Sequence, residues 1–150
     1  MISVPNAWIK LDLDILRNNI RKIQSSLSQD TQLIFVVKSN AYGHGMETVA
    51  KCAWECGICW FAVAHANEAI TLRKLLPDAH IIILGVLQPD EAETAVKENF
   101  VPFVVSAEHA ETLAAELQKG QMLHCHAEID TGMGRLGILW NKAPETIDAL

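Results

Sequence analysis

The stretch that decides the fold lies at residues 35–45, which read FVVKSNAYGHG. It begins as an apolar run typical of a buried parallel strand and ends in small residues that predict a turn. Lys38 stands where the run becomes the turn. Because α/β folds build their ligand sites at the carboxyl ends of parallel strands, Lys38 is the first candidate for a functional side chain.

Short apolar runs alternate with helical patterns along the whole chain, which predicts consecutive βα units and a parallel sheet. The five expected strands lie at residues 33–37, 60–64, 81–84, 100–105 and 123–129. The expected helices lie at residues 12–27, 47–56, 67–75, 89–98 and 106–118, and a further helix begins after Pro144. Helix caps are expected at Asp12 or Asp14 and at Ser106, with Pro89 in a first turn. Two folds suit this alternation: an open doubly wound sheet and the first part of a (β/α)8 barrel.

The composition indicates one globular domain and excludes several partners. The 150 residues are 50% hydrophobic and 20% charged, which is enough for one buried core. The formal net charge of -6 argues against nucleic acid and anionic membranes, because both bind clustered Lys and Arg. The longest apolar runs have strand length, well short of the roughly 20 residues of a membrane-spanning helix. Since the first residues lack a basic segment followed by an apolar core, we expect a cytoplasmic protein.

Three of the four cysteines have a spacing that allows two interpretations. Cys52, Cys56 and Cys59 form a C-x3-C-x2-C pattern, which is similar to the iron–sulfur ligand triplet of radical S-adenosylmethionine enzymes. However, Cys52 and Cys56 lie one turn apart on an expected helix, whereas Cys59 opens an expected strand. Core packing, which is common for free cysteine, is therefore favoured for these three and for Cys125. The histidines show no spacing that indicates a metal site.

The surroundings of Lys38 suit an amine that forms an imine. Its apolar approach favours the neutral amine, which can attack a carbonyl carbon and hold an aldehyde cofactor such as pyridoxal phosphate. Tyr42 could bring a hydroxyl to a phosphate near the lysine, and Gly43 and Gly45 let the backbone approach a ligand. Dinucleotide-binding and Walker loops do not fit, because the glycines are too few and follow the lysine. Taken alone, Lys38 is better explained as a strand-end lysine that is solvated or ion-paired than as a cofactor-binding residue. Its neighbours Tyr42, Gly43 and Gly45 shift the preference to the cofactor.

Two motifs carry a resemblance to a known family. Residues 37–45, VKSNAYGHG, resemble the pyridoxal phosphate attachment motif of alanine racemases, with Ser39 where alanine is more usual. Residues 130–137, DTGMGRLG, resemble a second motif of the same family. Between them, FAVA at 61–64, Glu68-Ala69, Leu72-Arg73 and IILG at 82–85 are similar to family segments in the same order. The resemblance runs from about Trp8 to the end of the chain. It implies an α/β fold made of the N-terminal part, about five βα units, of a (β/α)8 TIM-type barrel with parallel strands.

The resemblance also implies roles for individual residues. Lys38 would form the Schiff base with pyridoxal phosphate and act as the catalytic base on the face of the D-enantiomer. Tyr42 would contact the phosphate, and Arg135 would lie near the cofactor's phenolic oxygen and the substrate carboxylate. The family commonly has a lysine, often carbamylated, where this chain has Glu128. Glu128 is already an anion and could orient Arg135, although an exposed strand-end glutamate is an equally weighted alternative.

The function that the resemblance implies is interconversion of L-alanine and D-alanine, which supplies D-alanine for peptidoglycan. A complete member needs the other barrel strands, an arginine at the pyridine nitrogen, and a tyrosine base from the C-terminal β domain of a partner in a homodimer. We expect residues 1–150 to be the N-terminal portion of the barrel and these other parts to lie outside them. A serine or broad-spectrum racemase, and a cofactor-binding or assembly fragment without turnover, are the alternatives.

Overall fold

The computed structural model describes residues 7–148, and its main sheet has five parallel strands. These strands are β1 (Ile34–Val36), β2 (Trp60–Val63), β3 (His80–Val86), β4 (Phe100–Val104) and β5 (His126–Ala127). They lie in the order β1-β2-β3-β4-β5, so each strand pairs with the one before it in the chain. A doubly wound sheet reverses its order at a switch point, whereas a barrel does not. The order therefore agrees with the predicted N-terminal part of a barrel.

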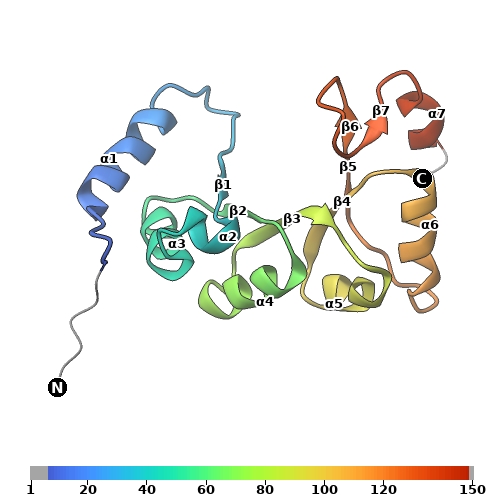
Figure 1. Ribbon diagram of the computed structural model, residues 1–150, viewed down its shortest axis with the longest axis horizontal. Coiled ribbons are helices and arrows are strands. Elements are labelled where there is room, and N and C mark those ends of the chain that lie inside the picture. The colour runs from blue at the N-terminus through green and yellow to red at the C-terminus, as the bar shows by residue number, and fades with distance from the viewer. Residues whose placement is uncertain (1–6, 149–150) are drawn as a thin grey trace.

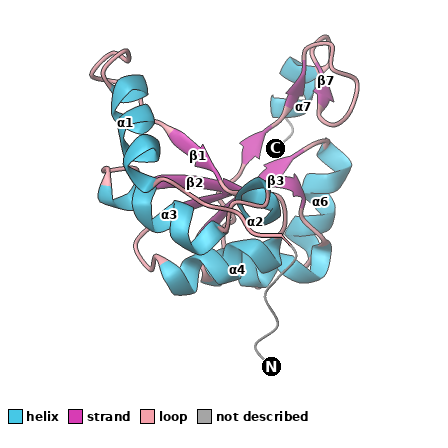
Figure 2. Ribbon diagram, turned by 60° about the vertical axis from the view of Figure 1, so that its left-hand side comes forward, coloured by secondary structure: helices cyan, strands magenta, loops and turns pink. Residues whose placement is uncertain are grey.

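Helices follow the strands and cover the outer face of the curved sheet (Figures 1 and 2). They are α3 (Met46–Glu55) after β1, α4 (Ala66–Leu75) after β2, η1 (Pro89–Glu91) and α5 (Ala92–Lys97) after β3, and α6 (Ala107–Ala115) after β4. Three further helices are α1 (Leu13–Gln24), α2 (Lys38–Tyr42) and α7 (Ala143–Asp148). Of these, α1 packs against α3. Within residues 7–148, every helix is too short or too polar to span a lipid bilayer.

The core lies between the sheet and these helices. Its wholly buried side chains include Phe61, Leu72, Ile81, Ile83 and Phe100. Burying each such side chain stabilises the fold by about 1.5–3 kcal/mol. The other face of the sheet is less covered at β1 only: its alternate residues Ile34 and Val36 are 47% and 37% exposed, whereas Ala62 and Ile82 on the same face of the central strands are buried. β1 is also an edge of the sheet, so this apolar side is open.

The predicted helix starts are confirmed by side-chain caps. Asp12 Oδ1 accepts hydrogen bonds of 3.1 Å from the N–H groups of Asp14 and Ile15 at the start of α1. Ser106 Oγ accepts one of 3.0 Å from the N–H of His109 at the start of α6. These two helices, α1 and α6, each end three residues earlier than predicted. α1 stops at Gln24 and is followed by serines, which bond backbone carbonyls and compete with the helix.

The fifth predicted strand, residues 123–129, is wrong in its extent. Only β5 pairs with β4. At Glu128 the chain changes partner: its N–H donates a hydrogen bond of 2.9 Å to the last residue of β4, and its carbonyl accepts one of 2.7 Å from the first residue of β7. β6 (Ile129–Asp130) and β7 (Ile138–Leu139) then pair in a separate two-stranded sheet. A predicted single strand is thus two short ones with different partners.

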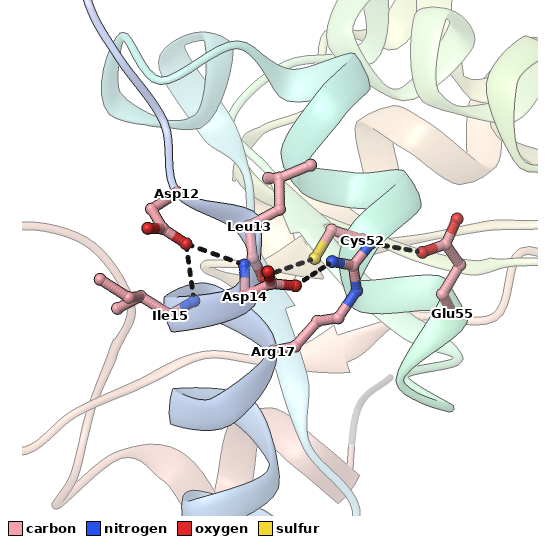
Figure 3. Close-up of polar contacts among 7 residues, drawn as sticks. All are labelled: Asp12, Leu13, Asp14, Ile15, Arg17, Cys52 and Glu55. Carbon is pink, nitrogen blue, oxygen red and sulfur yellow. Dashed lines mark hydrogen bonds and ion pairs between the residues drawn. The ribbon is translucent and has the colours of Figure 1, made fainter.

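Cys52 packs where α1 meets α3, which confirms core packing for this residue (Figure 3). Its Sγ atom lies 3.8 Å from the carbonyl oxygen of Leu13, and burial raises the pKa of the thiol. Arg17 of α1 also links the two helices, because its guanidinium donates a hydrogen bond of 3.1 Å to Glu55 of α3. The same guanidinium donates one of 3.0 Å to Asp14 of its own helix.

Core packing is wrong for two of the other cysteines. Cys59 and Cys125 are exposed, and Cys56 is half-buried. Cys59 precedes β2 and Cys125 precedes β5. The Cys59 carbonyl accepts a hydrogen bond of 2.9 Å from the N–H of His80 in β3, but its side chain stays outside the core. Residues 7–148 contain no group of three His, Cys, Asp or Glu side chains arranged to hold a metal ion.

Candidate functional site

Lys38 lies at the carboxyl end of β1, as predicted. The preceding residue, Val37, still donates a hydrogen bond of 2.8 Å to the carbonyl of Ala62 next to it in the sheet. Pairing stops there, and Lys38 begins α2. Val37 is wholly buried and Lys38 is half-buried, so the side chain leaves the core at the edge where parallel barrels bind ligands.

The turn after Lys38 has an uncommon backbone conformation. Ser39, Asn40, Ala41 and Tyr42 all have φ angles of 53° or 54°, which is the left-handed helical region. For L-residues this conformation costs about 1–2 kcal/mol each, so the surrounding structure must hold it. The small residues predicted a turn, but its handedness was missed, because the neighbouring glycines come only at its end.

Asn40 ties this left-handed turn to the helix that follows. Its carbonyl accepts a hydrogen bond of 2.9 Å from the N–H of Gly45, and its side-chain Oδ1 accepts one of 2.8 Å from the N–H of Met46. Ala41 is buried and donates a hydrogen bond of 2.9 Å to the carbonyl of Val37. The turn is therefore fixed both to the start of α3 and to the end of β1.

Glu68 binds the turn from a different βα unit. This residue lies in the first turn of α4, and its carboxylate accepts a hydrogen bond of 2.6 Å from the N–H of Ser39 and one of 2.8 Å from the N–H of Ala64. It thus joins the carboxyl ends of β1 and β2 beside Lys38. The sequence shows only an acidic residue early in a helix, and no local pattern signals this bridge.

Tyr42 closes the left-handed turn and is 61% exposed. It lines a cavity of about 390 Å³ between α1 and β1, whose other walls include Leu16, Phe35 and His44. The structure therefore places Tyr42 on the same turn as Lys38, with its ring accessible. Lys38 does not line this cavity.

The second sequence motif forms the loop between β6 and β7. Asp130 organises it, because its carboxylate accepts hydrogen bonds of 2.9 Å from the N–H of Gly132 and 3.1 Å from that of Gly134. The bonds from Gly134 and Gly132 hold the pKa of the Asp130 carboxyl below its usual value. Arg135 is exposed on this loop. Asp130 is a structural residue that the sequence reasoning did not single out.

Lys38 and Arg135 come after strands at opposite edges of the five-stranded sheet. Parallel strands direct their carboxyl ends one way, and β1 and β5 form the two edges of the five-stranded sheet. Arg135 follows β5 and β6, so three strands separate it from Lys38. Figure 2 shows β1 and the β7–α7 segment, which follows the β5 edge, at the two sides of the view.

Glu128 is half-buried at the point where β5 ends. Its Oε2 atom is buried and has no hydrogen-bond partner. Within residues 7–148 the ion pairs within 4.0 Å are Arg17–Asp14, Arg17–Glu55 and Lys51–Glu47, so Glu128 and Arg135 do not form an ion pair. A buried carboxylate oxygen without a donor costs about 1–3 kcal/mol or more. Glu128 has the capacity to accept a bond from a nearby cation.

Comparison with known proteins identifies the family of this site. Residues 11–150 match the family model described as "Alanine racemase, N-terminal domain". The chain belongs to the alanine racemase family. It is 36% identical over 145 residues to the alanine racemase of Geobacillus kaustophilus, an alignment that covers 97% of this chain and 38% of that protein.

Solved structures confirm the fold of this part of the alanine racemase barrel. The alanine racemase from Bacillus anthracis with bound L-Ala-P matches with a TM-score of 0.85 and 32% identity, over 92% of this chain and 36% of that one. A histidine racemase from Leuconostoc mesenteroides matches with a TM-score of 0.82 and 26% identity, over 91% and 37%. The chain therefore spans well under half the length of these relatives.

Proposed function

We propose that this chain contributes Lys38 to an amino-acid racemase that interconverts L-alanine and D-alanine with pyridoxal phosphate. The observation that carries the proposal is the position of Lys38. It leaves the carboxyl end of the first strand and is followed by a fixed left-handed turn, in a chain of the alanine racemase family. In a cell, this activity would supply D-alanine for peptidoglycan.

The chemistry of three side chains, those of Lys38, Tyr42 and Arg135, fits the cofactor. Lys38 offers a primary amine for covalent attachment to an aldehyde, and Tyr42 offers a hydroxyl to a phosphate. Arg135 offers a planar cation to the phenolic oxygen and to a substrate carboxylate. When bound, pyridoxal phosphate acidifies the Cα–H of an amino acid by delocalising the charge that remains after proton loss.

The chain's own residues would then move and orient groups around that Cα atom. The Lys38 amine would remove or return the Cα proton on the face of the D-enantiomer. Arg135 would hold the substrate carboxylate, and Glu128 would orient the Arg135 guanidinium. The buried, unpartnered Oε2 atom of Glu128 supports this last role, because it can accept a hydrogen bond from a cation.

Racemisation needs a second base on the opposite face. We propose that residues 1–150 form the N-terminal portion of the barrel, and that the other strands and a C-terminal β domain complete the site in a homodimer. The second base would come from that domain of the partner subunit. A fragment that binds the cofactor or assists assembly without turnover is the competing proposal, and it predicts no activity in any combination.

The substrate has a second candidate class. A histidine racemase matches this chain over 91% of its length, so this part of the barrel serves racemases of more than one substrate. A serine or broad-spectrum racemase is therefore compatible with the same Lys38 turn. Comparing L-alanine, L-serine and L-histidine as substrates of one preparation separates these candidates.

The test measures D-alanine formed from L-alanine with saturating pyridoxal phosphate. The chain is assayed alone and together with the C-terminal remainder of a related racemase, and Lys38→Ala is the control. We expect D-alanine only in the complemented reaction and none with Lys38→Ala. Activity of the complemented Lys38→Ala variant would refute the role of Lys38. Activity of the chain alone would refute the proposal that the second base lies elsewhere.

A further inference from the structure

Glu68 uses its carboxylate differently from the equivalent acid of the next βα unit. Glu91 accepts a hydrogen bond of 2.9 Å from the N–H of Gln88, the residue that caps its own helix. Glu68 instead reaches beyond its own helix to the N–H groups of Ala64 and Ser39, at 2.8 Å and 2.6 Å. Ser39 is 29 residues away in the chain. The contact therefore serves the β1 end as well as the helix.

The bridge continues the pairing of β1 with β2 past the point where the strands stop. The last backbone hydrogen bond between β1 and β2 runs from the N–H of Val37 to the carbonyl of Ala62 and is 2.8 Å long. Immediately beyond it, the N–H groups of Ser39 and Ala64 both point to the Glu68 carboxylate. Two donors side by side require two acceptors, and an ionised carboxylate supplies one oxygen to each.

One of these two donors, the N–H of Ser39, belongs to the left-handed turn of residues 39–42. Ser39 is the residue directly after Lys38 and the first of the four left-handed residues. Segments of this kind persist only where neighbouring groups hold them. Asn40 holds the turn from its far end, through Met46. Glu68 holds it at the end next to the lysine.

We infer that Glu68 is a positioning residue for Lys38: its carboxylate fixes the first amide of the left-handed turn and so directs the lysine side chain toward the ligand edge of the sheet. The inference rests on the proposed function in one respect: it takes from it that Lys38 binds the cofactor. It does not require Glu68 to touch the cofactor or the substrate.

The test compares Glu68→Gln with Glu91→Gln, a matched control that makes the same change in the next βα unit. A glutamine has one acceptor and one donor group, so it leaves one of the two N–H groups facing a donor. Amide hydrogen exchange is measured in residues 38–45 without cofactor. In parallel, pyridoxal phosphate and borohydride are added, and the rate of pyridoxyl labelling at Lys38 is followed by mass spectrometry.

We expect Glu68→Gln to speed exchange in residues 38–45 by roughly tenfold or more, and to slow labelling of Lys38 by a similar factor. Glu91→Gln should change neither. Unchanged exchange and unchanged labelling in Glu68→Gln would overturn the inference. If Glu68→Gln does not fold, Glu68→Asp takes its place: it keeps the charge on a shorter side chain, and the same two effects are expected.

The outcomes separate this inference from the proposed function. If Lys38 of the unmodified chain takes no label, the proposed function fails. Faster amide exchange in Glu68→Gln would still support the conclusion that the Glu68 carboxylate fixes the left-handed turn. If Lys38 is labelled equally fast in both proteins and exchange is unaltered, the proposed function stands and the positioning role is wrong. Equal loss of labelling in Glu91→Gln would indicate a general loss of stability and would also refute the specific role.

Discussion

The backbone N–H of Ile138 donates a hydrogen bond of 2.7 Å to the carbonyl oxygen of Glu128. This contact begins the pairing of β6 with β7 and so shapes the loop that carries Arg135. It depends on Gly137, where a Cβ atom would lie 2.9 Å from the same carbonyl oxygen and 3.0 Å from the Asp130 nitrogen. Gly137 also has a φ of +109°, which L side chains rarely adopt.

Gly137→Ala is therefore expected to break this contact and destabilise the β6–β7 pair. Backbone atoms cannot move aside as a side chain can, so we expect a loss of about 2 kcal/mol or more in the free energy of unfolding. Urea denaturation measures it. The control is Gly134→Ala, which has a positive φ but open space around the added methyl group, and should cost about 1 kcal/mol. Equal losses in the two variants would show that crowding at Gly137 is unimportant.

Arg73 is expected to stabilise the amino-terminal ends of the strands. Its guanidinium donates hydrogen bonds of 2.7 Å to the carbonyls of Pro77 and Ala79 and one of 2.9 Å to that of Glu98. Arg73→Ala leaves these three acceptors without the donor, so a loss of about 2 kcal/mol or more is expected in urea denaturation. Lys74→Ala, on the exposed side of the same helix, should change stability by less than about 0.5 kcal/mol. Equal losses of unfolding free energy in Arg73→Ala and Lys74→Ala would contradict this role of Arg73.

The loop around Asp130 should lose stability in acid. Because hydrogen bonds from Gly134 and Gly132 lower the pKa of the folded carboxyl, its contribution is complete above the ordinary Asp pKa of about 3.9 and is lost as the pH falls through the lower folded value. We expect the stability difference between the unmodified chain and Asp130→Asn to be constant above about pH 5 and to shrink below about pH 4. Chemical denaturation across this range gives the profile. A difference that grows toward low pH would reverse the assigned sign.

The cysteines should differ in their reaction with iodoacetamide. Cys52 is buried, and burial raises the pKa of its thiol, whereas Cys59 is exposed. The thiolate is the reactive form, so in the folded protein Cys59 should be alkylated first and Cys52 last. Peptide mass spectrometry at successive times measures the order, and denatured protein provides the control in which the difference disappears. Alkylation of Cys52 as fast as Cys59 in the folded protein would contradict the contact between α1 and α3.

The fold was predictable as far as local patterns reach. Apolar runs placed the first four strands, and Asp12 and Ser106 placed helix starts, because caps and strand propensity act over a few residues. The third strand runs to Val86, past its predicted end. Gly85 allows this extension: its N–H bonds the Ala64 carbonyl, and a Cβ there would collide with that carbonyl. The change of partner at Glu128 was missed, since it depends on a strand ten residues later.

The candidate site was predictable in its residues but not in its construction. The order of strand and turn placed Lys38 at a strand end, and the structure confirms that position. The left-handed conformation of Ser39 to Tyr42 was missed, because none of these residues is glycine and the hydrogen bonds that hold them come partly from elsewhere. The contact of Glu68 with the turn was missed for the same reason: its partner Ser39 lies in another βα unit. The roles of Tyr42, Arg135 and Glu128 stay predictions.

The central claim is that Lys38 is the lysine that binds pyridoxal phosphate. The most direct measurement is to incubate the chain with substoichiometric pyridoxal phosphate, reduce it with borohydride, and map the pyridoxyl group by peptide mass spectrometry. The account predicts a label concentrated on half-buried Lys38, with little on the exposed Lys51 and Lys74. A label spread over the exposed lysines, with no excess at Lys38, would contradict it.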